Sequence, residues 1–276
     1  MKRFLVFLFV LVCSGVAAQN QLGLEKPLGE IQVKNLDLIS IDTRDQIFAS
    51  TTSGDIYLFD QTGKQLNLFS PTRQGRLHQL EASWTVNIFS FSSDLQEYRI
   101  LDRFLNPLAE NSFVLNEIIL PKAATLGNNN VIWVWDESDL SLKSLDYQRN
   151  LVLQTQPLNL ILDSENLSVS EIREFKNRLF MNVPQSGIFI FDNQGNFLQK
   201  VDLKLDQRLC FFNERLFWTE DGTLKMYELT SKTKFDLGPL PSPNSKLVQI
   251  GREIIVFGEK DLVKVYSLPK ELKELK

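Results

Sequence analysis

The sequence is poor in the residues on which many enzyme active sites depend. It contains one histidine, His78, and two cysteines, Cys13 and Cys210, among 276 residues. Zinc and copper sites built from several His and Cys ligands are therefore excluded by number. A Gly-x-Ser-x-Gly elbow, a phosphate-binding glycine loop and a His-Glu-x-x-His motif are also absent. We therefore expect no metal and no cofactor, and we interpret His78 as a structural or solvated imidazole.

Long apolar runs are absent after the first 18 residues. Lys2 and Arg3 precede an apolar run over residues 4–12, and residues 16–18 read Val-Ala-Ala. This layout predicts a secretory signal peptide over residues 1–18. The apolar run is shorter than the roughly 20 residues that cross a bilayer. We expect export to the periplasm or the extracellular space, with no transmembrane span in the mature chain.

Cysteine is too scarce for an intramolecular disulfide in that mature chain. Only Cys210 would remain, beside Leu209 and Phe211, where a small buried hydrophobic residue is expected. Lipid attachment at Cys13 is disfavoured, because Val12 precedes it where such signals have a small residue. A hydrophobic core must therefore hold the fold, and a chain of this length can bury about three quarters of its unfolded surface.

An excess of positive charge is missing as well. The chain has 30 Lys and Arg against 34 Asp and Glu, mixed along its length. The densest basic run alternates with acids near the C-terminus, and we interpret residues 271–276 as a charged, solvated tail. Nucleic-acid binding has no support, because it requires clustered cations opposite phosphates.

The chain is rich in a repeat of short apolar strands and turns. Six residues that close such a strand follow one another at steps of 36 to 46 residues: Asp60, Asp102, Asp146, Asp192, Glu228 and Ser267. An apolar residue precedes each of them by 11 to 13 positions: Phe48, Phe89, Trp133, Phe180, Phe217 and Ile255. That offset corresponds to a strand, a tight turn and a second strand.

Four short strands in each unit of about 40 residues are typical of a β-propeller blade. The repeats predict an all-β fold over residues 19–270, a single six-bladed β-propeller of four-stranded antiparallel blades. The sixth unit lacks a fourth strand. We expect residues 28–33 to supply it by pairing with the strand around Val263 to Tyr266, which would close the ring and cover an open sheet edge.

Two of the repeats carry a family resemblance. The segments Ile56-Tyr-Leu-Phe-Asp60 with Gly63, and Ile188-Phe-Ile-Phe-Asp192 with Gly195, resemble the central strand and turn of NHL-type repeats in six-bladed propellers. The resemblance spans all six units and is strongest in these two. The resemblance implies a fold and a binding platform. It does not imply any one activity, because propellers include lyases, hydrolases, sugar and peptide binders and scaffolds.

Carboxylates recur in the turns, where a structural role is the simpler interpretation. The closing acids follow a strand and enter a turn, so we expect them to accept backbone N–H groups rather than to ring a metal. Residues 136–139, Asp-Glu-Ser-Asp, lack the spacing of a calcium loop and are expected to be solvated.

The first strand of each blade should line the central channel, so charged residues there are candidates for ligand binding: Asp42, Arg44, Glu81, Lys122, Glu171, Arg173, Arg208 and Lys246. They can orient a ligand at the channel mouth. They can also pair with one another and fill the channel, which we favour. The tryptophans Trp84, Trp133, Trp135 and Trp218 are expected in blade cores rather than on a sugar-stacking platform.

Three functional hypotheses follow from these observations. The leading one is an exported, non-catalytic propeller that binds a protein, a peptide or an envelope component. The second is a carboxylate-dependent hydrolase or lyase that acts on a glycan or lactone, with Asp42, Glu81 and Glu171 at the channel mouth. The third is a structural part of an envelope assembly.

Overall fold

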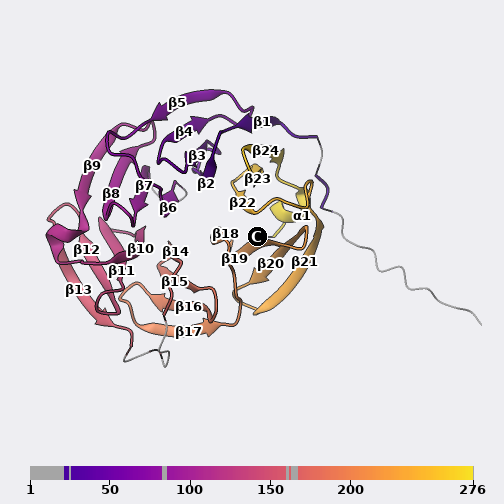
Figure 1. Ribbon diagram of the computed structural model, residues 1–276. Coiled ribbons are helices and arrows are strands. Elements are labelled where there is room, and N and C mark those ends of the chain that lie inside the picture. Colours follow the sequence, from indigo (N-terminus) through magenta and orange to yellow (C-terminus); the bar gives the residue numbers. More distant parts are fainter. Residues whose placement is uncertain (1–21, 25, 83–85, 160–161, 163–166, 276) are drawn as a thin grey trace, which may run out of the picture.

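The computed structural model describes residues 22–24, 26–82, 86–159, 162 and 167–275, so the signal peptide predicted over residues 1–18 and Trp84 lie outside the described residues. Six four-stranded antiparallel sheets surround a central axis (Figure 1). The prediction of an all-β, six-bladed propeller is confirmed. Within the described ranges no helix is long and apolar enough to cross a membrane.

The first three blades follow the chain from the inner to the outer strand. Blade 1 comprises β2 (Leu36–Ile41), β3 (Ile47–Thr51), β4 (Ile56–Phe59) and β5 (Gln65–Phe69). Blade 2 comprises β6 (Gln79–Glu81), β7 (Asn87–Ser92), β8 (Glu97–Asp102) and β9 (Pro107–Ser112), and the short helix η1 (Phe113–Asn116) follows it. Blade 3 comprises β10 (Pro121–Leu126), β11 (Val131–Asp136), β12 (Ser141–Asp146) and β13 (Leu151–Pro157).

The next three blades continue the same order until the last strand. Blade 4 comprises β14 (Glu171–Phe175), β15 (Arg178–Val183), β16 (Gly187–Asp192) and β17 (Phe197–Val201). Blade 5 comprises β18 (Cys210–Phe212), β19 (Arg215–Glu220), β20 (Thr223–Glu228) and β21 (Thr233–Pro239). Blade 6 comprises β22 (Leu247–Ile250), β23 (Ile254–Glu259), β24 (Leu262–Ser267) and, as its outer strand, β1 (Gly29–Gln32).

The N-terminal strand β1 closes the ring. It pairs antiparallel with β24, with Gly29 opposite Val265 and Ile31 opposite Val263. Backbone hydrogen bonds extend the pairing on both sides, from the Leu28 N–H to the Val265 carbonyl and from the Val33 N–H to the Asp261 carbonyl. This is the pairing expected from the missing fourth strand of the sixth repeat.

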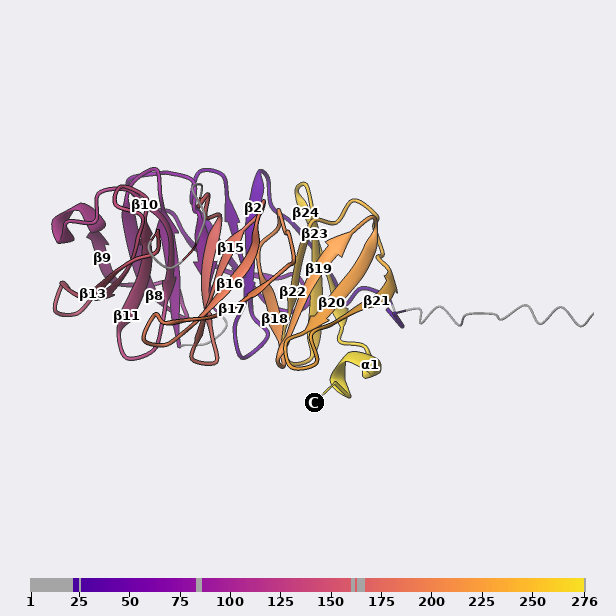
Figure 2. The same ribbon diagram turned by 90° about the horizontal axis from the view of Figure 1, so that it is seen from below.

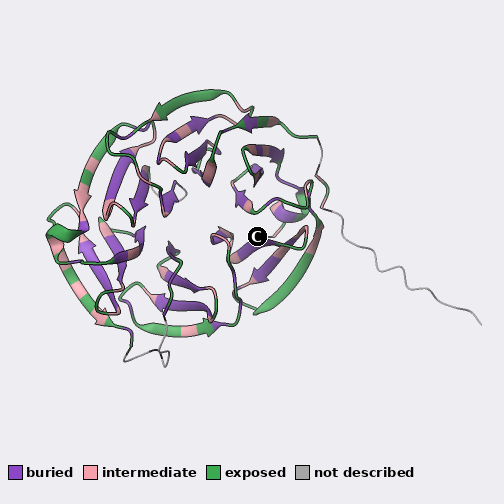
Figure 3. Ribbon diagram, in the orientation of Figure 1, coloured by how far each residue is buried: buried purple, intermediate pink, exposed green. Residues whose placement is uncertain are grey.

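The second strand of each blade carries the core residue that the repeat predicts. The six aromatic or aliphatic residues at this position are at most 4% exposed: Phe48, Phe89, Trp133, Phe180, Phe217 and Ile255. Each faces an inner-strand partner in the ladder: Ser40, Glu81, Thr125, Arg173, Cys210 and Ile250. Burial decreases toward the rim, where the outer strands are largely exposed (Figure 3). The sequence offset therefore marks one register in all six blades.

The closing acids cap their turns as expected. In each of four blades one carboxylate oxygen accepts the backbone N–H two positions on and a second N–H three or four positions on: Asp60, Asp102, Asp146 and Asp192. Their side chains thereby satisfy donors that the turn leaves without a strand partner. No group of three or more His, Cys, Asp or Glu in the described parts of the chain is placed to hold a metal ion.

The C-terminal residues differ from the solvated tail that the charges predict. They form a turn of helix, α1 (Lys270–Lys273), against one face of the ring (Figure 2). Leu272 is buried and joins the core of blades 5 and 6, and the Leu275 carbonyl accepts hydrogen bonds from Asn213 and Arg215. Leu272 in the helix and Leu275 just after it both pack on this core, which the alternating charges conceal in the sequence.

Candidate functional site

The charged residues predicted at the channel do not converge at one mouth. Inner strands of all blades run in the same direction, so their starts lie on one face of the ring and their ends on the other (Figure 2). Asp42 and Arg44 follow the end of β2. The other face receives the residues at or before the start of an inner strand: Lys122, Glu171, Arg208 and Lys246. Glu81 and Arg173 occupy equivalent positions along their strands, within the channel.

Four of the residues near the faces are engaged in local contacts or are exposed, as Lys246 also is. Asp42 accepts the backbone N–H groups of Arg44 and Gln46, so it is a turn cap like the closing acids. The Arg44 side chain is exposed. Lys122 lies 3.7 Å from the Glu137 carboxylate, and Arg208 donates to the Ser170 carbonyl at 3.2 Å.

Inside the channel, two carboxylates from blades 2 and 4 come together. The Gln79 side-chain amide donates to the carboxylates of both Glu81 and Glu171. The Thr125 hydroxyl donates to Glu81 at 3.0 Å, and an Arg173 guanidinium nitrogen lies 3.9 Å from Glu171. Glu81, Glu171 and Arg173 are only 6%, 2% and 5% exposed. Of the candidate charges, Glu171 and Arg173 thus form an ion pair with each other inside the ring.

The same side chains hold neighbouring blades together. The inner strand of a blade has a free edge, and its N–H groups need acceptors other than a further strand. Ser40 accepts the N–H of Ala82 in the next blade. Thr125 accepts the N–H of Glu174, and the Glu171 carboxylate accepts the N–H of Leu209 at 2.8 Å. Polar residues on the inner strands therefore have a structural reason to be there.

Burial changes the acid–base behaviour of Glu81. Desolvation raises the pKa of its carboxyl to about 7, against the pKa-lowering effects of Arg173 and of the hydrogen bonds from Gln79 and Thr125. The unfolded chain titrates near the ordinary value of 4.5. At a pH between these two pKa values, the native state binds more protons at Glu81 than the unfolded state does. The contribution of Glu81 to the stability of the fold therefore falls as the pH rises through this window.

We expect Glu81→Gln to remove that fall. The free energy of unfolding of the variant, relative to wild type, should grow by up to about 3 kcal/mol between about pH 4.5 and 8. Chemical denaturation across this range measures the difference. The matched control is Glu117→Gln on an exposed turn, which should leave the wild-type profile unchanged. A constant difference between Glu81→Gln and wild type across the range would contradict the desolvation argument.

The remaining candidates from the sequence are structural. The Nδ1 atom of His78 accepts the Ser93 N–H at 3.1 Å, and burial lowers the pKa of this imidazole. Cys210 is buried, which raises the pKa of its thiol to about 12. A thiol with this pKa stays protonated at neutral pH and is a poor nucleophile.

The acidic turn of blade 3 is neutralised rather than solvated. Asp136 is fully buried and accepts the N–H groups of Ile119 and Leu120. Lys143 lies 2.7 Å from Asp136 and 2.9 Å from Asp139. The expectation of a solvated turn is wrong for Asp136, because Lys143 on the next strand supplies a buried counter-charge that local sequence does not reveal.

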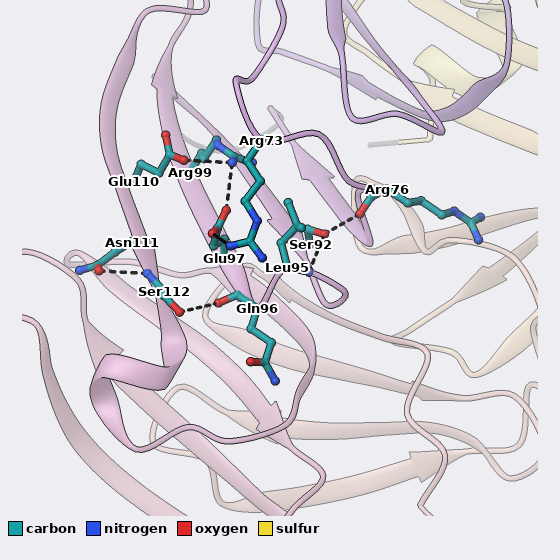
Figure 4. A network of polar contacts seen from close by, with 10 residues as sticks. All are labelled: Arg73, Arg76, Ser92, Leu95, Gln96, Glu97, Arg99, Glu110, Asn111 and Ser112. Atoms are coloured by element: carbon teal, nitrogen blue, oxygen red, sulfur yellow. Dashed lines mark hydrogen bonds and ion pairs between the residues drawn. The ribbon is translucent and has the colours of Figure 1, made fainter.

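A second ionic network lies at the rim of blade 2 (Figure 4). The buried Arg99 on β8 contacts the carboxylates of Glu97 at 3.1 Å and Glu110 at 3.0 Å. Arg73, from the connection between β5 and β6, contacts Glu97 at 2.6 Å. Two arginines thus face two glutamates, and the network ties an inter-blade connection to the blade that follows it.

An apolar band on the surface was not predicted from the sequence. Its residues lie on β9, in η1 and in the segment after η1, which the buried Phe113 and Ile118 anchor to the core. Its exposed members are Leu108, Val114, Leu115, Ile119 and Leu120, of which Leu115 is 70% and Ile119 is 65% exposed. We call these five residues the η1 band. Several exposed apolar residues in one segment of the chain are a candidate interaction surface.

Comparisons with known proteins show the fold alone. No family model matches the chain, and no curated protein matches its sequence. The WD40 domain of Pan2 from Neurospora crassa is similar over 89% of this chain and 95% of that one, with a TM-score of 0.63 and 12% identity. The β-propeller domain of Cps50 (Swd1) from Myceliophteria thermophila covers 88% and 99%, at a TM-score of 0.61 and 11% identity.

A propeller enzyme is similar to the chain to a comparable degree. A catalytically inactive virginiamycin B lyase from Staphylococcus aureus covers 84% of this chain and 80% of its own, with a TM-score of 0.55 and 12% identity. A lyase and two propeller domains thus resemble the ring at TM-scores between 0.55 and 0.63. At identities this low the comparisons establish a β-propeller and assign no activity.

Proposed function

We propose that the protein is an exported, non-catalytic β-propeller that binds a protein partner or an envelope component through its surface. The observation that carries the proposal is the η1 band, which presents Leu115 and Ile119 to solvent on a rigidly anchored loop. Phe113 packs against Tyr98 and Phe91 at ring distances of 4.9 and 5.6 Å, so the loop is held in place by the core. Export rests on the signal-peptide pattern of residues 1–18.

The centre of the ring gives further support for binding over catalysis. A hydrolase at the channel would need Glu81 or Glu171 to reach a substrate. Both carboxylates are buried and already accept hydrogen bonds from side chains or backbone of other blades. One observation favours the alternative, a hydrolase or lyase, because a carboxyl with a pKa near 7 beside a second carboxylate suits general acid catalysis.

Partner capture with matched variants tests the proposal. We expect the mature chain to recover its partner after crosslinking in the exporting cell. The double variant Leu115→Glu, Ile119→Glu should reduce this recovery by at least about tenfold, because charge at the centre of an apolar interface is costly. Leu198→Glu, at an exposed leucine on blade 4, is the control and should capture normally.

Two results would contradict the binding proposal. The first is equal recovery of the same partners by the double variant. The second is glycosidase or lactonase activity in the purified chain that Glu81→Ala or Glu171→Ala abolishes while the circular dichroism spectrum stays native. The second result would establish the alternative, with the channel carboxylates as its catalytic groups.

A further inference from the structure

A polar pocket lies between blades 3 and 4, apart from both the channel cluster and the η1 band. Its volume is about 510 Å³, within the range of about 300–1,000 Å³ that is usual for ligand sites. The turn after β10, the turn after β14, the turn after β16 and the outer strand β13 form its walls. Figure 1 shows these two blades side by side in the ring.

Carboxamides dominate the walls of this pocket. Six Asn and Gln residues line it: Asn128, Asn129, Gln154, Asn177, Asn193 and Gln194. Each carboxamide offers both donors and an acceptor, as a sugar hydroxyl also does. No Lys or Arg is among the lining residues, so the pocket offers no counter-charge to a phosphate, a sulfate or an acidic sugar.

Glu174 is the unusual residue of the pocket. It is 8% exposed and lines the cavity, and its carboxylate has few polar contacts, namely the Asn128 N–H at 3.4 Å and the side chain of Trp133. No ion pair joins it to a cation within the described residues. One carboxyl oxygen lies 2.1 Å from the position that a Cβ on Gly127 would take, so a larger residue there would require the Glu174 side chain to move.

The other blades show that the fold does not require a carboxylate at this position. The residue that follows the inner-strand partner of the core position is apolar or glycine in every other blade: Ile41, Ala82, Leu126, Phe211 and Gly251. Burying a carboxylate with so few contacts is costly. A local departure of this kind is expected where function, rather than stability, selects the residue.

We propose that this pocket binds a neutral oligosaccharide. The Glu174 carboxylate can accept hydrogen bonds from two adjacent hydroxyls, and the surrounding carboxamides supply both donors and acceptors for the rest of the ring. Trp133 adds an apolar edge to the cavity. This is a second site, and it goes beyond the proposed protein-binding role of the η1 band.

Isothermal titration with maltotriose, cellotriose and tri-N-acetylchitotriose, each at about 1 mM, tests the proposal. At least one should bind the mature chain. Glu174→Leu gives blade 4 the residue that blade 3 carries at the same position, so the melting temperature of this variant should match or exceed that of wild type. Its affinity for the sugar should fall at least about tenfold. Asn193→Ala should weaken binding in the same direction. The control is Gln61→Ala, at the equivalent turn position of blade 1, which should bind normally.

Any one of four results would overturn the proposal. Failure of all three sugars to bind excludes a neutral oligosaccharide of this size. Binding that survives both Glu174→Leu and Asn193→Ala places the sugar elsewhere. A loss of melting temperature in Glu174→Leu shows that the carboxylate serves the fold. Binding of tri-lysine in place of the sugars would identify Glu174 as the counter-charge of a cationic ligand.

Discussion

Deleting residues 19–33 from the mature chain should lower the melting temperature by at least about 10 °C. The deletion removes β1 and the residue after it, and Ile31 of β1 and Val33 are buried in the core between blades 6 and 1. Losing two large aliphatic side chains from a core costs several kcal/mol of folding free energy. In a chain of this size, each kcal/mol lost lowers the melting temperature by about 2–4 °C. It also exposes the edge of β24, which should promote association of the chains.

Differential scanning calorimetry and light scattering measure both effects of this deletion. The control is Glu30→Ala, which changes an outward-facing residue of β1 and should leave the melting temperature within about 2 °C of wild type. An unaltered melting temperature after the deletion would show that β1 contributes nothing to ring closure.

Phe180→Ala should destabilise the fold by about 3–5 kcal/mol, the usual range for removal of a large aromatic side chain from a packed core. Phe180 is 1% exposed and contacts Phe211 and Phe175, with ring centroids 4.6 and 6.3 Å away. It therefore joins the inner strands of blades 4 and 5, and its removal leaves a cavity between them.

Urea denaturation of Phe180→Ala measures this loss of stability. Phe104→Ala is the matched control, since Phe104 is 52% exposed and should cost under about 1 kcal/mol. A similar small cost for both variants would mean that the repeat register, which assigns Phe180 to the core, is misplaced.

The fold was predictable because its signals are local and occur six times. A strand, a turn and a second strand have nearly constant length. Phe48 and Phe180 therefore indicate the same core position in the second strand of their blades, although the two blades share little sequence. Ring closure by β1 was predictable from a missing strand. The docking of Leu272 was not, because it depends on the shape of blades 5 and 6 and not on the charged residues around it.

The candidate sites were much less predictable. Sequence analysis identified Glu81, Glu171 and Arg173 as inner-strand charges. The position of each side chain along the channel, however, depends on strand direction and register. The carboxamide pocket was missed because its walls come from four segments of two blades. A signal was present, since Glu174 interrupts a position that is apolar or glycine in the other repeats, and Asn177 follows shortly after it.

Pairing between the first and last strands determines when the fold can be completed. Five blades use strands that are consecutive in the chain, so each can form as soon as its own segment is available. Blade 6 needs β1, which is made first, and β24, which is made last. A chain that stops before residue 262 therefore keeps β1 as an unpaired strand, open to proteases and chaperones. The β23–β24 hairpin is thus the last element that the ring needs before β1 is covered.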